Sequence, residues 1–281
     1  MIPPEGLYHH SPSMDHHNKD DPKDKGDNLM LTVTGLPRDL AEYVDFSMIS
    51  QAEGLKFALE HFRRRKPHCS GTLFWQLGDC WPALSWSVLD YHGFGKAGYY
   101  YVKRAYSPIL ASFKTLSDGG AELWITNDML ETPTDNVLVR LAGFDGGIVW
   151  EETLPLRAPA NASLPVARWT EAQIGKDRGR YLSVASANGR FPKNRHFFAA
   201  IKDLDRAPTE PEVALETVGD NELRVTLRTA GYAYFVHLEV PDDAARFSDN
   251  FFDLEPGEER TIFVTNAKRP LRSELVEVRW R

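Results

Sequence analysis

A change of pattern near residue 108 limits the folds that this chain can adopt. Before it, the spacing of apolar residues predicts a helix over 43–66, a short buried strand over 70–76 and an aromatic helix near 96–106. After it come many short alternating segments, separated by turn signals such as Asp118-Gly119-Gly120. A single helix–strand–helix repeat cannot bury both faces of a parallel strand. We therefore expect the part before residue 107 to be the end of a larger α/β unit, and the chain to be a fragment.

The helix over 43–66 is predicted from one apolar stripe and a clear end. Apolar residues recur at spacings of three and four, namely Met48, Ala52, Leu55, Leu59 and Phe62. Basic residues crowd the last turn, where cations favour the negative end of the helix dipole; they are Arg63, Arg64, Arg65 and Lys66. Pro67 then stops the helix. We expect the basic run to be a solvated helix end.

The segments that follow the helical part predict two antiparallel β-sandwiches. Prolines in the stretch 206–211 mark the best linker between them. The expected fold class is α+β with several domains: residues 1–106 as the remnant of an α/β unit, then sandwiches over 107–206 and 207–281. Residues 1–40 are polar and rich in proline, so we expect a long surface loop there with about one helical turn.

Composition narrows the classes of function. Forty acidic residues against 33 basic ones give a net charge of −7, which repels phosphate backbones, so no nucleic-acid partner is expected. No stretch approaches the ~18 apolar residues of a membrane span, and no membrane partner is expected. The N-terminus has no basic region followed by an apolar one, so we expect no signal peptide in this chain. The compartment stays open: cytoplasmic or, with a signal upstream, periplasmic, secreted or lysosomal.

The two cysteines, Cys69 and Cys80, are too few for a disulfide scaffold. They flank the expected strand and would lie about a strand length apart, so we expect two buried thiols and no disulfide. Adjacent histidines occur twice, at His9–His10 and His16–His17, but without the i, i+4 spacing that aims two imidazoles at one ion. A solvated or pocket-lining loop is the favoured interpretation, and no metal site is predicted.

Tryptophans concentrate directly after the predicted strand. Trp75, Trp81 and Trp86 fall within twelve residues, together with Asp79 and several tyrosines further on. An indole ring beside a carboxylate suits a sugar, whose C–H face stacks on the ring while its hydroxyls need hydrogen-bond partners. The end of a barrel strand is also where such folds carry their sites. The alternative is that these aromatic residues fill the core between strand and helices.

The segment from Cys69 to Pro108 contains Gly71-Thr-Leu-Phe-Trp-Gln-Leu-Gly-Asp-Cys-Trp-Pro, followed by a second characteristic stretch from Ser85 to Lys96. With these residues the segment closely resembles the end of the catalytic barrel in family-2 glycoside hydrolases of the β-mannosidase type. Residues 11–18 are similar to the loop after the nucleophile strand, and residues 247–257 to the last immunoglobulin-like domain of the family. One departure is Gly78, where asparagine is expected.

The resemblance implies that the chain is the C-terminal end of a (β/α)8 barrel followed by two immunoglobulin-like β-sandwiches. It implies a retaining exo-β-mannosidase that hydrolyses terminal β-D-mannose residues with one glutamate as nucleophile and another as acid/base. Both would precede this chain, and Glu5, in an irregular Pro-Gly context, is not promoted to nucleophile. We therefore expect no catalytic residue here, no cofactor and no metal, and a chain that is inactive alone. Its partners would be the N-terminal part of the enzyme and a mannose-containing oligosaccharide or glycoside.

The resemblance also assigns three substrate-binding residues. Trp75 aligns with the tryptophan that forms the platform under the sugar in the −1 subsite. Asp79 would hold the loop or touch a hydroxyl, and Trp81 would border the mouth of the pocket, whereas Trp86 would pack beneath it. Other readings stay open: a carbohydrate-binding or structural sandwich module, or a related specificity such as exo-β-glucosaminidase or β-galactosidase. A binding module would display two or three tryptophans in a row on one exposed sheet.

Overall fold

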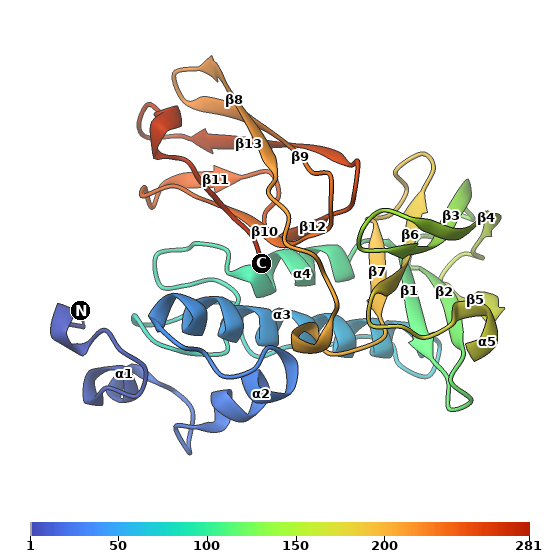
Figure 1. The fold of residues 1–281 in the computed structure, drawn as a ribbon, viewed down its shortest axis with the longest axis horizontal. Helices are drawn as coiled ribbons and strands as arrows, with labels where there is room; N and C mark the ends of the chain where they lie inside the picture. The colour runs from blue at the N-terminus through green and yellow to red at the C-terminus, as the bar shows by residue number, and fades with distance from the viewer. Residues whose placement is uncertain (1) are drawn as a thin grey trace. The chain divides into compact units, whose positions relative to one another are not determined.

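The structure is a computed structural model that describes residues 2–281. Its contacts group the chain into two compact units. Unit 1 comprises residues 2–52, 75–100 and 206–281, and unit 2 comprises residues 53–74 and 101–205. Figure 1 gives the order of the elements along the chain. Among the described residues, no helix is both long and apolar enough to cross a membrane.

The helices agree with the predicted stripes except near the N-terminus. They are η1 Pro4–Gly6, α1 Pro12–His17, α2 Lys25–Val33, α3 Leu40–Arg64, α4 Ala97–Ala105, α5 Glu171–Ile174, η2 Ile201–Asp203 and η3 Ser273–Leu275. The helices predicted over 43–66 and 96–106 are confirmed as α3 and α4. The N-terminal segment holds two α-helices rather than one turn, because Ser11 caps α1 through Met14 N and because Met14, Met30 and Tyr43 form a buried cluster.

Residues 2–281 form fourteen strands, all of them after residue 108. Those of unit 2 are β1 Ile109–Thr115, β2 Ala121–Asn127, β3 Thr134–Gly143, β4 Ile148–Arg157, β5 Ala162–Trp169, β6 Arg180–Ser186 and β7 Asn194–Phe197. Those of unit 1 are β8 Glu212–Gly219, β9 Glu222–Arg228, β10 Ala233–Glu239, β11 Ala245–Phe247, β12 Phe252–Leu254, β13 Glu259–Asn266 and β14 Glu277–Arg279. All the strand pairs are antiparallel, as the alternating segments predicted.

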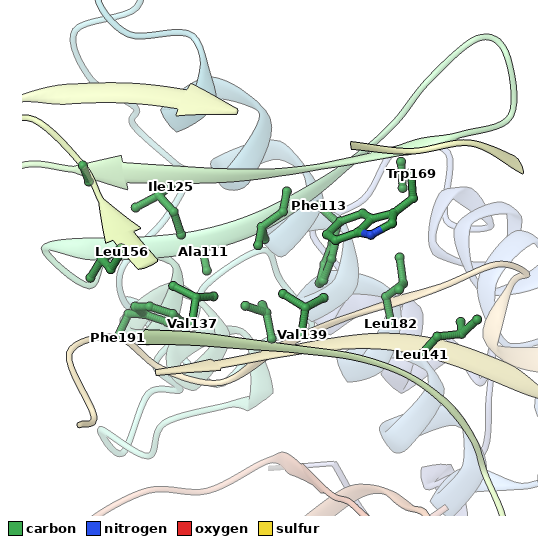
Figure 2. Close-up of a cluster of buried hydrophobic side chains, with 14 of the residues drawn as sticks. Ala111, Phe113, Ile125, Val137, Val139, Leu141, Leu156, Trp169, Leu182 and Phe191 are labelled. Carbon is green, nitrogen blue, oxygen red and sulfur yellow. The ribbon is translucent and has the colours of Figure 1, made fainter. Parts of the chain in front are cut away.

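Unit 2 contains a sandwich of two sheets, with strand orders β1-β2-β5 and β4-β3-β6-β7. Buried residues alternate with less buried ones along much of β2 and β3, as the period of two requires. In Figure 2, Ala111 and Phe113 of β1 and Ile125 of β2 lie opposite Val137 and Val139 of β3. Each of these side chains is at most 6% exposed, so the core lies between the two sheets.

Unit 1 contains the second sandwich, with strand orders β11-β13-β9-β8 and β12-β10-β14 (Figure 1). Its core again uses alternate positions, among them Leu223, Val225 and Leu227 of β9, all fully buried. The edge strand β8 is exposed at every residue.

The strand predicted over 70–76 is wrong for this chain. Leu73, Phe74 and Trp75 belong to no ladder formed by residues 2–281. Backbone pairing begins after them, where Val88 N donates to Gln76 O at 3.0 Å and Leu89 N donates to Leu77 O at 2.7 Å. Side-chain exposure nevertheless alternates along 71–77, as it does in a strand. A strand is stabilised by hydrogen bonds to neighbouring strands, and no described segment takes that place.

The basic end of α3 is also not the solvated end that was predicted. Arg63 and Arg64 are 7% and 8% exposed. Arg63 donates to the carbonyl oxygens of Ala105 and of Ser107 and to Asp128 Oδ2, the last at 2.8 Å. Burial lowers the pKa of Arg63, and the Asp128 carboxylate opposes that shift.

The cysteines also differ from the prediction of two buried thiols. Both thiols are free, Cys80 is exposed and Cys69 is only partly buried.

Candidate functional site

Trp75 presents its indole ring outward from the segment 71–77. Its exposure is 73%, and its neighbours two positions away, Leu73 and Leu77, are 101% and 61% exposed. The peptide bond between Trp75 and Gln76 is cis. Among residues 2–281, no ring contact or hydrogen bond engages the Trp75 side chain. The ring is therefore free to stack on a ligand.

Asp79 has the opposite environment, because its carboxylate faces its own loop. Its side chain is 2% exposed. Ser85 Oγ and Ser87 Oγ each donate to it at 2.5 Å, and Lys96 Nζ lies 3.3 Å away. Burial alone would raise the pKa of Asp79, but the two hydroxyl donors and the Lys96 ammonium outweigh it and leave the pKa below its ordinary value. Asp79 is therefore an anionic centre that holds the loop.

Trp81 lies against the N-terminal segment. The His17 ring stacks on it with centroids 4.6 Å apart, His16 meets it edge-on at 5.9 Å, and Lys19 Nζ lies 4.8 Å from the ring centroid. His17 Nδ1 is 2.6 Å from the Pro82 carbonyl oxygen, which fixes the imidazole over the indole. Trp81 is half-buried. One indole face is thus occupied by protein groups.

Backbone hydrogen bonds fasten this loop to the N-terminal segment. Lys19 N donates to Leu84 O at 2.9 Å, and Leu84 N donates to His17 O at 3.0 Å. Trp86 Nε1 donates to Asp20 Oδ1 at 3.0 Å, and Gln51 Nε2 of α3 donates to Trp86 O at 2.8 Å. Trp86 keeps 40% of its surface exposed. The loop that follows Trp75 is therefore held from two sides.

The structure does not bring the three predicted site residues into mutual contact. Among residues 2–281, no hydrogen bond or ring contact joins the side chains of Trp75, Asp79 and Trp81. The sequence analysis missed His17 and Lys19 as neighbours of Trp81; the resemblance of residues 11–18 to a loop beside the active site was the available signal. Glu5 lies exposed in η1.

One group of side chains among the described residues has metal-ligating chemistry. His9, His10 and Asp27 place one ligand atom each within 4.8 Å of one another. The group lies in the N-terminal segment, and no recorded contact joins it to Trp75 or Trp81.

Comparisons with known proteins agree with this architecture. A model described as "Mannosidase Ig/CBM-like domain" matches residues 119–203, and a mannosidase model described as "Ig-fold domain" matches residues 209–279. Beta-mannosidase B of Thermothelomyces thermophilus is 27% identical over 304 aligned residues, which cover 95% of this chain and 35% of that protein. The chain thus spans about a third of the length of the curated relatives it matches.

Solved structures give the same result. The β-D-mannosidase of Dictyoglomus thermophilum matches with a TM-score of 0.89 at 25% identity, over 100% of this chain and 35% of that one. An exo-β-D-glucosaminidase matches with a TM-score of 0.69 at 18% identity, over 96% of this chain and 38% of that one, which shows a shared fold alone. Because both sandwiches match mannosidase domain models and nearly the whole chain aligns with β-mannosidases, the chain belongs to the family-2 glycoside hydrolases of the β-mannosidase type.

Proposed function

We propose that this chain supplies the sugar-platform wall of the active site in a retaining exo-β-mannosidase that removes terminal β-D-mannose. The observation that carries the proposal is Trp75, an indole 73% exposed at the end of an unpaired segment in which every second side chain is exposed. A lone exposed tryptophan of this kind has a large apolar face and no protein partner. A sugar ring with its C–H face toward the indole would satisfy it.

Within this proposal, residues 70–76 occupy the place of the eighth strand of a (β/α)8 barrel. They pair as a strand only with the rest of that barrel, whose other strands lie outside these 281 residues. Residues 1–106 are then the end of the barrel, and residues 107–206 and 207–281 are two immunoglobulin-like domains. The alternating exposure of residues 71–77 and the unpaired backbone at Leu73 and Phe74 support this, since neighbouring strands would pair that backbone. The remaining part of the enzyme is the protein partner that we propose.

In this proposal, catalysis and substrate binding are divided between the rest of the enzyme and this chain. Retaining hydrolysis needs one carboxylate to attack the anomeric carbon and a second to protonate the leaving oxygen. We assign both glutamates to the part outside this chain, and no catalytic residue to the chain itself. Trp75 stacks on the sugar, Trp81 borders the mouth of the pocket, and Asp79 acts through the loop that it holds between them. This division makes the chain inactive alone, and it requires no cofactor.

The test is Trp75→Ala in the full-length enzyme that contains this chain, assayed on an aryl β-mannoside. We expect kcat/KM to fall more than about 100-fold, or about 2.7 kcal/mol, because stacking must support a flattened, cationic sugar in the transition state. Trp124→Ala is the matched control, since that half-buried indole of β2 donates to Glu122 at 2.9 Å and lies in a sandwich. Equal kcat/KM for the Trp75→Ala and wild-type enzymes would remove Trp75 from the site.

A carbohydrate-binding module is the main alternative, and the tryptophans of the sandwiches argue against it. Trp150 stacks on Trp169 with centroids 5.5 Å apart, and Trp169 is 5% exposed, so this pair packs in the core. Trp280 Nε1 donates to Thr209 O at 2.7 Å. These three side chains already have protein partners, so no row of free indoles is formed by them. Tight binding of manno-oligosaccharides that is abolished by Trp124→Ala, and not by Trp75→Ala, would favour the module.

A second alternative keeps the glycosidase function but changes the sugar that the enzyme prefers. The exo-β-glucosaminidase relative shares the fold, and β-galactosidase is a further family-2 specificity. A panel of aryl β-mannoside, β-glucosaminide and β-galactoside separates these three for the full-length enzyme. We expect the highest kcat/KM for the mannoside.

A further inference from the structure

Two adjacent histidines converge on one carboxylate in the N-terminal segment of unit 1. His9 Nε2 lies 3.0 Å from Asp27 Oδ1, and His10 Nε2 lies 2.7 Å from Asp27 Oδ2. Asp27 belongs to the first turn of α2, so the contact joins positions 17 and 18 residues apart in sequence. The sequence analysis predicted no metal site here because adjacent histidines lack the i, i+4 spacing that aims two imidazoles at one ion.

The backbone at His10 explains why both rings reach the same acid. Its φ is +58°, in the left-handed region that residues other than glycine seldom adopt. This conformation costs about 1–2 kcal/mol and persists only where surrounding contacts enforce it. The ring centroids of His9 and His10 are 4.0 Å apart, and the His9 ring also packs on the buried Tyr43 at 4.1 Å. The left-handed residue and the Tyr43 contact thus aim two imidazole nitrogens at one point.

A second carboxylate orients the His10 ring from its other side. His10 Nδ1 lies 3.1 Å from Asp15 Oδ1 in α1. At 2.7 Å from Asp27 Oδ2, Nε2 donates to that carboxylate while no ion is bound. An ion would displace the Nε2 proton, and Nδ1–H would go on donating to Asp15. A ring nitrogen that donates to a carboxylate while the other binds an ion is the usual arrangement around metal-ligating histidines, and it raises the basicity of the ligand.

We propose that His9, His10 and Asp27 bind a divalent transition-metal ion of the zinc type, with Asp15 as a positioning residue. Two imidazole nitrogens and one carboxylate form a ligand set that such ions accept, whereas Mg²⁺ and Ca²⁺ prefer oxygen ligands alone. The ligand side chains are 21% to 36% exposed, which leaves a route for the ion and space for water as a further ligand. Bonds of about 2.0–2.1 Å to a tetrahedral ion place ligand atoms further apart than the present N···O contacts of 3.0 and 2.7 Å, so both contacts must open to admit the ion.

The ion would link the segment before α1 to the start of α2. An ion that binds the folded form and not the unfolded chain stabilises the fold in proportion to the logarithm of its concentration over its dissociation constant. The inference does not depend on glycosidase activity, because no substrate group or catalytic glutamate takes part in it.

The test is calorimetric titration of the untagged full chain with ZnCl2, repeated with MgCl2. We expect one zinc ion per chain and no magnesium binding. Asp27→Asn and His9→Gln should each weaken zinc binding at least tenfold, a loss of about 1.4 kcal/mol. The matched control is His16→Gln, since His16 is an exposed member of the other adjacent pair in the same segment, and it should bind zinc as the wild type does.

A Co²⁺ titration followed by visible absorption provides a second readout that does not depend on heat. Intense d–d bands that appear in the wild type and in His16→Gln, and disappear in His9→Gln, would support the site. Circular dichroism checks that each variant folds; should Asp27→Asn fail to fold, His9→Gln decides. The proposal is overturned if no stoichiometric zinc binding occurs, if His9→Gln binds zinc as the wild type does, or if His16→Gln abolishes binding.

Discussion

Trp75 and Asp79 stand four residues apart, and their surroundings differ completely. The indole is 73% exposed with no partner, while the carboxylate side chain is 2% exposed and is held by two serine hydroxyls and Lys96. Sequence resemblance indicated both residues but could not separate a ligand-facing role from a loop-holding one. That separation depends on which donors surround the carboxylate, and Ser85, Ser87 and Lys96 are brought together only by the folded loop.

His196 in β7 is the residue whose ionisation should make unit 2 sensitive to acid. Burial first, then the nearby charges of Lys56, Arg195, Arg64 and Lys176, lower the pKa of His196 from 6.5 to about 4. Its ring nitrogen Nε2 lies 3.3 Å from Thr115 Oγ1, and no carboxylate contact to it is recorded among the described residues. As the pH falls, His196 therefore binds a proton in the unfolded chain at a pH where it is still neutral in the folded chain.

We expect the contribution of His196 to the free energy of unfolding to be constant above about pH 6.5 and to fall between pH 6.5 and 4. The loss is at most on the order of 3 kcal/mol, at 1.36 kcal/mol per pKa unit. His196→Phe should flatten this part of the urea-unfolding profile, while the exposed control His68→Phe should leave it unchanged. The same slope in His196→Phe and in the wild type would contradict the assignment.

At the scale of elements, periodicity predicted those helices and strands whose formation depends on residues within the segment itself. The apolar stripe of α3 and the alternation of β2, β3 and β9 come from spacing within each segment. The helix α3 lies where its stripe predicted it, and the strands follow residue 108, as predicted. The strand over 70–76 was wrong because its stability depends on neighbouring strands that residues 2–281 do not provide. Sequence spacing contains no information on whether such neighbours are present.

The end of α3 shows the same limit for charged residues. Helix-dipole reasoning placed four cations in one solvated run, yet Arg63 is buried and donates to Ala105 O, to Ser107 O and to Asp128. These carbonyls lie at the end of α4 and just beyond it, so the guanidinium links the ends of two helices inside unit 2. Only tertiary structure distinguishes this arginine from its neighbour Arg65, which is exposed.

Arg63→Met should therefore destabilise unit 2 by about 3 kcal/mol, because it leaves buried carbonyl oxygens without donors. The urea-unfolding midpoint measures this change. Arg65→Met is the matched control two residues along and should alter stability by no more than about 0.5 kcal/mol. A similar small effect from both substitutions would show that the Arg63 contacts contribute little.

At the scale of the whole molecule, the exposed apolar row of segment 71–77 is a surface that a monomeric protein does not ordinarily leave uncovered. Leu73, Trp75 and Leu77 are 101%, 73% and 61% exposed, and the backbone from Leu73 to Trp75 belongs to no ladder formed by residues 2–281. Exposed apolar patches and unpaired strand-like edges promote association. On the proposed function, the rest of the barrel covers this row.

We expect the isolated chain to self-associate as its concentration rises, and Leu73→Ser combined with Leu77→Ser to reduce that association. Light scattering coupled to size exclusion gives the mass at each concentration. Leu130→Ser is the control, because Leu130 is 88% exposed but lies in the loop between β2 and β3. Association that persists in the double variant and disappears in Leu130→Ser would show that the chain associates through a surface other than segment 71–77.

The central claim is that the chain forms a sugar-binding wall and leaves catalysis to the rest of the enzyme. The initial rate of aryl β-mannoside hydrolysis, measured for the purified 281-residue chain and for a full-length enzyme containing it, tests this claim most directly. We predict turnover by the full-length enzyme and, for the chain alone, a rate equal to that of a heat-denatured control. Turnover by the chain alone that survives rigorous purification, or none by the full-length enzyme, would contradict the account.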